Sequence, residues 1–267
     1  MKAFEGVLKN PLDGRTAKPR KTGYTMVIDK GLGLNATKDL MDTASDYIDS
    51  LKQTFGTSHF FNEKLIRDKI EVVKAAGVIV YPGGTFGEIA LMQGKLAEYL
   101  KRVKELGFTG VEVSDGTIEM TTEQRHDFIK RAKDMGFVVI SEVGKKDPND
   151  KVAYEQMHFD IAQDLECGSS KVIVEARESG KGVGIYDGSG NPDAAEVDAI
   201  IAGVKDPSVL VWEAPMKNQQ LWLIKKFGMN VNLGNVPPEE ALVLEALRCG
   251  LRGDTLKMAW LGKHPGK

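Results

Sequence analysis

Eight short runs of apolar residues alternate with helical stretches along this chain, and this alternation limits its fold more than any other feature. The runs recur about every 29 residues, which is the length of one strand–helix unit. Several of them, such as residues 137–140, are continuously apolar, as is typical of parallel strands buried on both faces. The predicted strands are residues 24–29, 48–54, 77–81, 110–114, 137–142, 171–175, 208–213 and 229–233.

The stretches between these runs have the apolar period of amphipathic helices. Thr121 and Gln124 have the spacing of a capping box at a helix start. An open doubly wound sheet is the alternative, but residues 29–33 after the first run lack the third glycine of a dinucleotide-binding fingerprint, and no Walker motif occurs. The sequence therefore predicts a (β/α)8 TIM barrel. We expect one domain over residues 1–267, with a short N-terminal extension (1–22) and a C-terminal tail (256–267).

Composition excludes several kinds of partner. The chain has 36 Lys and Arg against 38 Asp and Glu, so its net charge of −2 gives no electrostatic reason to bind nucleic acid or a membrane surface. Its longest apolar run, residues 75–81, is far too short to cross a bilayer. With two cysteines and no leader pattern, we expect a cytoplasmic protein with reduced thiols. The oligomeric state stays open, with a homo-oligomer as one alternative.

Acidic residues end four consecutive predicted strands, and the carboxyl ends of barrel strands carry the chemistry of barrel enzymes. They are Glu112, Glu142, Glu175 and Glu213. Carboxylates gathered in one cavity repel each other unless cations compensate them. The histidines are scattered, so the natural metal is a hard ion such as Mg²⁺. We predict Mg²⁺ as cofactor, with Glu112, Glu142 and Glu175 as ligands. The alternative for each glutamate is a structural ion pair with a neighbouring Lys or Arg.

Cationic residues follow the same strands and indicate an anionic substrate. They are Lys30, Lys52, Lys145, Lys146, Arg177 and Lys217. Lys52 lies within a predicted buried strand, where an unpaired ammonium is costly, so we predict that it is functional. Arg177 can bind a carboxylate or phosphate with two hydrogen bonds. Residues 234–235 are expected to form a turn after the last strand, where barrels often bind phosphate. Lys146 is expected to face solvent beside Asp147 and is left out of the site.

The residues after the strands resemble those of the phosphosulfolactate synthase family. The similar segments occur in order and span residues 19 to 255. They are residues 19–23, 29–31, 81–85, 112–116, 141–146, 175–182, 213–215, 232–233 and 251–255. One segment departs from the family, which usually has Lys-Phe-Gly-Trp-Gly-Thr-Ser where this chain has residues 52–58, Lys-Gln-Thr-Phe-Gly-Thr-Ser. The changes at Gln53, Thr54 and Phe55 leave the geometry of this loop and the choice of substrate open.

The resemblance implies Mg²⁺-dependent addition of sulfite to phosphoenolpyruvate, which gives (2R)-phospho-3-sulfolactate. It implies that these two small anions are the partners and that Lys145 is the general acid. Lys52 is predicted as a second catalytic residue from its position in a buried strand. We assign anion binding to polar residues around the mouth of the barrel, the opening at the carboxyl ends of its strands: Lys30, Arg177, Ser179, Gly234 and Asn235. Two alternatives stay open. One is another TIM-barrel enzyme that acts on a phosphorylated or enolisable carboxylic acid, and the other is a non-catalytic, stress-associated relative.

Overall fold

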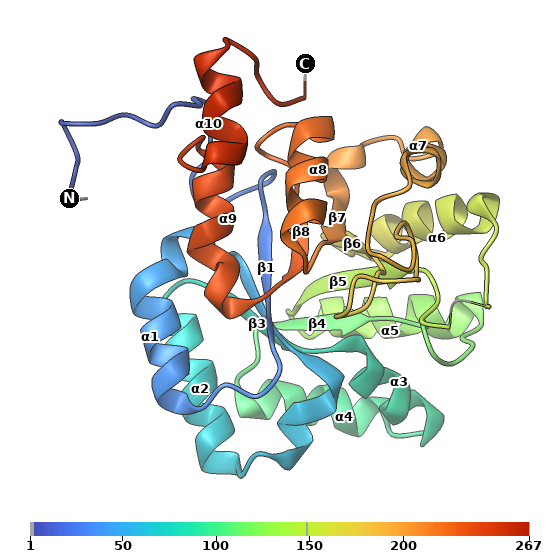
Figure 1. Cartoon of the computed structure of the whole chain (residues 1–267). Helices are drawn as coiled ribbons and strands as arrows, with labels where there is room; N and C mark the ends of the chain where they lie inside the picture. The colour runs from blue at the N-terminus through green and yellow to red at the C-terminus, as the bar shows by residue number, and fades with distance from the viewer. Residues whose placement is uncertain (1–2, 148, 267) are drawn as a thin grey trace.

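The computed structural model describes residues 3–147 and 149–266 and contains one sheet of eight strands (Figure 1). The strands are β1 (Thr25–Asp29), β2 (Ser50–Gln53), β3 (Ile79–Pro82), β4 (Gly110–Val113), β5 (Val138–Val143), β6 (Lys171–Val174), β7 (Leu210–Glu213) and β8 (Leu233–Val236). They pair in parallel in the order β3-β2-β1-β8-β7-β6-β5-β4. The last gap is bridged where the backbone N–H of Thr109 donates to the Val80 carbonyl at 3.0 Å. The sheet is therefore a nearly closed barrel, as predicted.

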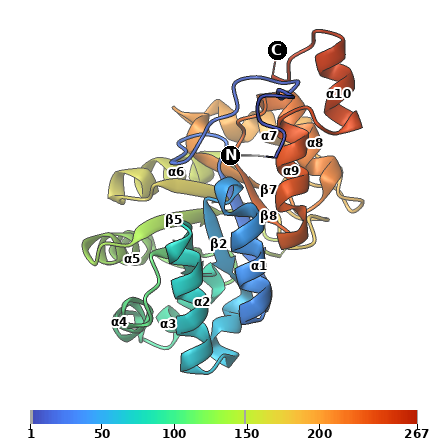
Figure 2. The ribbon, with the colours of Figure 1, turned by 90° about the vertical axis from the view of Figure 1, so that its left-hand side faces the viewer.

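Helices lie around the outside of this barrel (Figures 1 and 2). They are α1 (Leu34–Ala44), α2 (Glu63–Ala75), α3 (Gly84–Met92), α4 (Leu96–Leu106), α5 (Thr122–Asp134), α6 (Tyr154–Cys167), α7 (Ala194–Ala202), α8 (Lys217–Phe227), α9 (Ala241–Arg248) and α10 (Gly253–Trp260). Four short 3-10 helices also occur, η1 (Ser45–Tyr47), η2 (Thr54–Phe60), η3 (Pro207–Val209) and η4 (Pro238–Glu240). The capping box predicted at Thr121 and Gln124 is confirmed at the start of α5.

Alternation along the strands divides the apolar core into two layers. The outward side chains pack against the helices, and paired residues such as Val27 and Leu51 of neighbouring strands belong to this layer. A smaller cluster fills the inside of the barrel: Tyr24, Met26, Tyr81, Ile140, Ile173 and Val211. The inside of the barrel is thus packed, and open space is left only beyond the carboxyl ends of the strands.

The last strand was predicted at residues 229–233, but the observed strand begins four residues later. Residues 229 and 230 form a turn, and β8 begins only at Leu233. Before it, the Asn232 side chain accepts a hydrogen bond from the Tyr24 N–H at 2.9 Å and donates to the Leu210 carbonyl, also at 2.9 Å. These side-chain bonds add to the backbone hydrogen bond that the Trp212 N–H donates to the Asn232 carbonyl at 3.1 Å. Residues 234–235 therefore lie within β8, and the turn predicted for them after the strand is wrong.

The two ends of the chain pack on the barrel in different ways. In the N-terminal extension, Leu12 is fully buried and its N–H donates to the Cys249 carbonyl at 3.1 Å. The C-terminal tail predicted from residue 256 begins inside α10. Within the described residues, none of the helices has the length and apolar character needed to span a membrane.

Candidate active site

Strand alternation carries glutamates to the mouth of the barrel. In three strands an apolar residue points into the barrel, and a glutamate follows two positions later at the carboxyl end: Ile140 and Glu142, Ile173 and Glu175, Val211 and Glu213. Glu112 is buried at the same end of β4. Two residues separate side chains on one face of a strand, so the packed layer below fixes the acidic layer above it.

Lys52 lies at the centre of three of these glutamates. Its ammonium nitrogen is 3.0 Å from Glu112 Oε1 and 3.4 Å from one oxygen each of Glu142 and Glu213. Burial by itself lowers the pKa of a lysine, but the three carboxylates outweigh burial and raise the pKa of Lys52 well above its usual value. Lys52 therefore stays protonated, and the predicted buried cation is paired.

Lys146 provides a second ammonium in the same cluster. Its Nζ lies 2.8 Å from Glu142 Oε1, 3.1 Å from Glu175 Oε2 and 3.7 Å from Glu88 Oε1. Glu142 and Glu175 raise its pKa although burial opposes them. The prediction that Lys146 faces solvent was wrong, because it is joined to three buried carboxylates.

Lys145 is directed elsewhere, although it was predicted at the mouth. Its ammonium donates to the Asp115 carbonyl oxygen at 2.6 Å and lies 3.3 Å from Asp115 Oδ2. Gly144, just after β5, has a φ of +106°. Beyond it, Lys146, and not Lys145, contacts the carboxylates of the cluster.

The carboxylates of the cluster differ in how well they are compensated. Burial raises the pKa of Glu112 to about 7, against the opposing effect of Lys52. Burial, then the charges of Glu142 and Glu213, raise the pKa of Glu175 well above its usual value. Glu142 also loses hydration, but Lys146 and Lys52 overcome this and lower its pKa. Of these three glutamates, Glu142 is the one whose negative charge the two lysines stabilise most.

The fit of this cluster to Mg²⁺ follows from these contacts. Both oxygens of Glu142 are occupied by lysines, which argues against its predicted role as a ligand. Glu112 keeps a buried oxygen, Oε2, without a hydrogen-bond partner. Within the described residues, no group of three or more His, Cys, Asp or Glu side chains is arranged to hold a metal ion. Both oxygens of Glu175 are also occupied, Oε1 by the Arg177 N–H at 2.6 Å and Oε2 by Lys146 at 3.1 Å. Mg²⁺ commonly takes only one or two carboxylates and completes its shell with water and substrate oxygens, so Glu112 is the glutamate that fits such an ion.

Glu112 also connects the cluster to helix α3. Its Oε1 accepts a hydrogen bond from the backbone N–H of Gly84, the first residue of α3, at 2.7 Å. A Cβ at position 84 would lie 2.5 Å from Ser114 Cβ and 2.9 Å from Glu112 Oε1, so only glycine allows this approach. The start of α3 thereby forms part of the mouth.

A cavity of about 290 Å³ opens above the cluster. Its lining includes Lys52, Glu112, Lys146, Glu175, Arg177, Glu213 and Asn235. Five of the predicted site residues do not line it: Lys30, Glu142, Lys145, Ser179 and Gly234. Lys30 and Ser179 are exposed, and Gly234 is packed within β8 against Met26. The mouth thus collects the central charges but not all of the predicted anion-binding residues.

Backbone strain is concentrated at this cavity. Among the described residues, three non-glycine residues have a positive φ, and all three line the mouth: Phe55 (57°), Arg177 (62°) and Asn235 (51°). Residues held in such conformations cost free energy and tend to gather where ligands bind. Two of them are linked, because the Asn235 side-chain amide donates to the Arg177 carbonyl at 3.3 Å.

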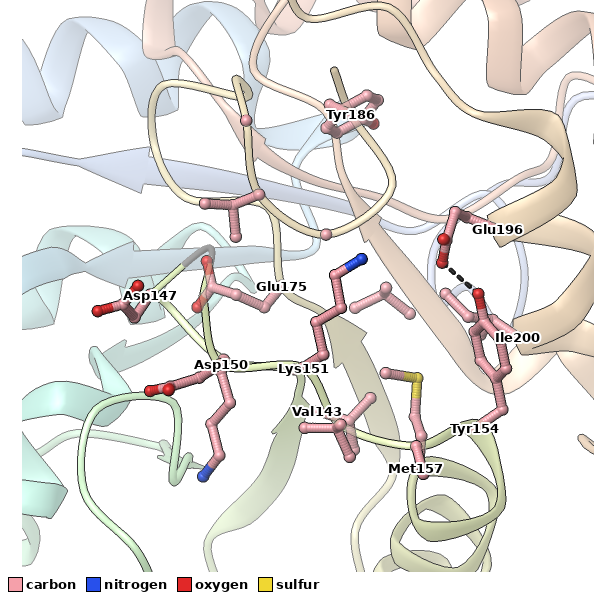
Figure 3. A pocket seen from close by; sticks show the side chains of 18 of the residues that line it. Val143, Asp147, Asp150, Lys151, Tyr154, Met157, Glu175, Tyr186, Glu196 and Ile200 are labelled. Atoms are coloured by element: carbon pink, nitrogen blue, oxygen red, sulfur yellow. Dashed lines mark hydrogen bonds between the residues drawn. The ribbon is translucent and has the colours of Figure 1, made fainter. Parts of the chain in front are cut away.

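A second cavity lies beside the mouth, between the loops that follow β5 and β6 (Figure 3). It has about 630 Å³ and is lined by Lys145, Lys151 and Glu175, among others. The Tyr154 hydroxyl donates to Glu196 across one side of it (Figure 3). This cavity is larger than the mouth, but the buried lysine–glutamate pairs lie at the mouth, so the mouth is the candidate active site.

Two functional candidates were missed by sequence reasoning. Lys146 was set aside because its neighbour Asp147 suggested a solvated loop. Glu88 was not considered, although it is the only charged residue in the apolar segment of α3 and is buried. It accepts hydrogen bonds from Ser114 Oγ at 3.2 Å and from the Thr117 N–H at 2.9 Å, which fixes the loop after β4.

The barrel and its buried charges define the class of protein. Solved structures with the same fold include the YdjI aldolase from Escherichia coli K12, with a TM-score of 0.54 and 14% identity over 92% of this chain and 93% of that one. Another is 3-hexulose-6-phosphate synthase from Salmonella typhimurium, with a TM-score of 0.52 and 15% identity over 84% and 98%. At these identities the likeness shows the fold alone. The chain therefore belongs to the (β/α)8 barrel class of folds.

Its family follows from more similar relatives. The family model described as (2R)-phospho-3-sulfolactate synthase (ComA) matches residues 13–254. The phosphosulfolactate synthase of Methanothermobacter thermautotrophicus is 44% identical over 91% of this chain and 94% of its own, and that of Bacillus subtilis is 41% identical over 90% and 95%. Protein HEAT-STRESS-ASSOCIATED 32 of Arabidopsis thaliana is 24% identical over 96% and 91%. The chain belongs to the phosphosulfolactate synthase family and is a carbon–sulfur bond-forming lyase of that kind.

Proposed function

We propose that this protein catalyses the Mg²⁺-dependent addition of sulfite to phosphoenolpyruvate, which gives (2R)-phospho-3-sulfolactate. The observation that carries the proposal is the pair of ammonium groups of buried Lys52 and half-buried Lys146, in a mouth of about 290 Å³. Two protonated lysines and Arg177 at one small cavity suit reactants that are all anions, because they offset the repulsion between them.

The reaction needs charge stabilisation and one proton. The sulfur lone pair of sulfite attacks the methylene carbon of phosphoenolpyruvate and forms the carbon–sulfur bond. The electron pair of the carbon–carbon double bond moves toward the carboxylate, which becomes enediolate-like. A general acid then protonates the adjacent carbon, and no group leaves. Interactions that grow stronger as charge moves onto the carboxylate accelerate this step.

The residues of the mouth divide these tasks. Lys52 lies deepest and is held by three carboxylates, so we assign it to the developing enediolate charge. Lys146 keeps its proton and borders the cavity, so we assign it the proton donation, in place of the Lys145 that the family resemblance implies. Arg177, positioned by Asn235, is assigned to the phosphate. Glu112, through its unpartnered Oε2, would hold Mg²⁺, which when bound supplies further positive charge for the substrate carboxylate.

The state of the two cysteines bears on where in the cell the protein acts. Cys167 and Cys249 are not joined by a disulfide bond. A protein with reduced thiols that uses two small metabolites is suited to the reducing cytoplasm, where we propose that it acts.

One assay tests the reaction. The protein is mixed with phosphoenolpyruvate, sulfite and Mg²⁺, the loss of enol absorbance is followed, and the product is identified by mass spectrometry. We expect phosphosulfolactate only when all three are present, with activity lost in EDTA and restored by added Mg²⁺. Turnover of phosphoenolpyruvate with another nucleophile or carbonyl compound, but not with sulfite, would replace the proposal by a different enolate enzyme. No turnover with any partner would favour the non-catalytic alternative.

A further inference from the structure

A groove beside the mouth has the properties of a ligand site. It has about 770 Å³ and lies between η2, α2, α3 and α4. We propose that it binds a small, uncharged molecule with an aromatic or alicyclic body and one hydrogen-bonding group, and that binding there is coupled to the mouth through the loop after β2. Well-formed apolar cavities with a few polar groups are the usual form of small-molecule sites.

The aromatic side chains that line the groove indicate the shape and polarity of the main part of the ligand. Phe86 lies edge-on to Tyr99 with 5.4 Å between ring centroids, and His59 lies edge-on to Phe86 at 6.0 Å. Phe60 and Ile89, at the rim, are 85% and 37% exposed. An aromatic or alicyclic ring would bury this exposed apolar surface and pack against the existing ring edges.

The polar group of the ligand is specified by two hydroxyls. Ser58 and Tyr99 both line the groove and are more than nine-tenths buried. Neither Ser58 Oγ nor the Tyr99 hydroxyl has a hydrogen-bond partner. A buried polar group without a partner is costly, and a ligand hydroxyl or carbonyl would supply the missing bond.

The charges at the rim indicate that the ligand is neutral. Arg102 is paired with Glu63 at 2.6 Å, and Lys95 is paired with Glu98 at 3.2 Å. These cations are thus already compensated within the chain. An anionic ligand would have to compete with Glu63 and Glu98 for the two cations, Arg102 and Lys95.

The groove and the mouth share two walls, which provide the coupling. Phe55 lines both cavities and is held at a φ of +57°, while Thr54 before it lines the mouth and Gly56 after it lines the groove. A Cβ at Gly56 would lie 3.5 Å from the Phe86 ring, so this loop rests on α3. In the first turn of α3, Gly84 and Thr85 line the mouth and Phe86 lines the groove. A ligand against Phe86 therefore contacts both elements that shape the mouth.

The test uses 2-naphthol as the probe and naphthalene, which lacks the hydroxyl, as its matched control. Binding of each is followed by ligand fluorescence. We expect 2-naphthol to bind the native protein, and Ser58→Ala to weaken it by roughly three- to tenfold while naphthalene changes by less than about twofold. Tyr99→Phe is made in parallel to find which hydroxyl bonds the probe. Ile89→Trp, at the exposed rim, fills the groove and is expected to weaken both probes by more than about tenfold.

Coupling is read by amide hydrogen exchange, which requires no turnover and is independent of the proposed reaction. We expect 2-naphthol to slow exchange in residues 54–60 and in the first turn of α3, and to have no such effect in Ile89→Trp. Absence of binding overturns the site, and binding without slowed exchange overturns the coupling. Sedimentation identifies the remaining alternative: a native oligomer that Ile89→Trp dissociates, together with no binding of 2-naphthol, would make the groove a contact between copies and overturn the proposal.

Discussion

The ammonium of Lys52 lies 3.0 Å from Glu112 Oε1, and both side chains are almost completely buried. Burial weakens the screening of this pair by solvent, so each charge depends on the other and on the neighbouring carboxylates. This pair links β2 to β4 across the mouth and, through the Gly84 N–H, to the start of α3. It is therefore both a structural contact and the centre of the candidate active site.

Removal of the Lys52 charge is the first prediction. Lys52→Met leaves Glu112, Glu142 and Glu213 without their shared cation, so we expect a loss of about 3–5 kcal/mol in the free energy of unfolding and no measurable turnover. Urea unfolding and the sulfite-addition assay measure the two effects. Lys64→Met is the control, because Lys64 pairs with Asp68 on the surface and should change stability by less than about 1 kcal/mol. Equal stability of the two variants would contradict the buried pairing.

The second prediction separates two adjacent lysines. Lys146→Met should lower kcat by roughly 10²- to 10⁴-fold, because it removes the proposed proton donor. Lys145→Met should lower kcat by less than about tenfold, because Lys145 is bonded to Asp115 and does not line the mouth. Steady-state kinetics of the two variants decide between them. The reverse order of effects would return the general acid to Lys145.

The third prediction concerns pH. The Glu112 pKa is raised by burial to about 7 in the folded protein, against an ordinary value of 4.5. A raised pKa contributes stability that is complete below pH 4.5 and is lost as the pH rises toward 7, because the unfolded chain loses its proton first. The difference is on the order of 3 kcal/mol. We expect the Tm, measured in EDTA without substrates, to fall less between pH 5 and pH 7 in Glu112→Gln than in the native protein. Parallel Tm profiles would show that Glu112 ionises normally.

The fourth prediction tests the link between Asn235 and Arg177. Asn235→Gly keeps a residue that adopts positive φ easily but removes the amide that donates to the Arg177 carbonyl. We expect KM for phosphoenolpyruvate to rise several-fold while the Tm changes little. Asn235→Ala should show the same rise in KM together with a lower Tm, because alanine is strained at this φ. An unchanged KM in both variants would remove Asn235 from substrate binding.

Local patterns accounted for the elements of this fold, and they failed where the chain leaves regular structure. The repeat of strands and the Thr121 capping box were predicted because each depends on near neighbours in sequence. The four strand-end glutamates were also found from strand position alone. The start of β8 was missed because the Asn232 side chain bonds Tyr24 and Leu210, which are distant along the chain. The placement of Lys145 and Lys146 was missed because it depends on contacts with Asp115, Glu88 and Glu175, which lie on other parts of the chain.

The sequence by itself determined that this chain forms a barrel of strand–helix units and that acidic and basic residues meet at its carboxyl ends. The period of the apolar residues gives this information, because side chains alternate every two residues in a strand and return to one face every three to four residues in a helix. Only the tertiary structure decided which charges pair, that Lys146 joins Glu142 and Glu175, and that Glu88 lies beneath the mouth. Those contacts join residues from different strands and loops, and their electrostatic free energies depend on burial and on distances of a few ångströms, which no local pattern encodes.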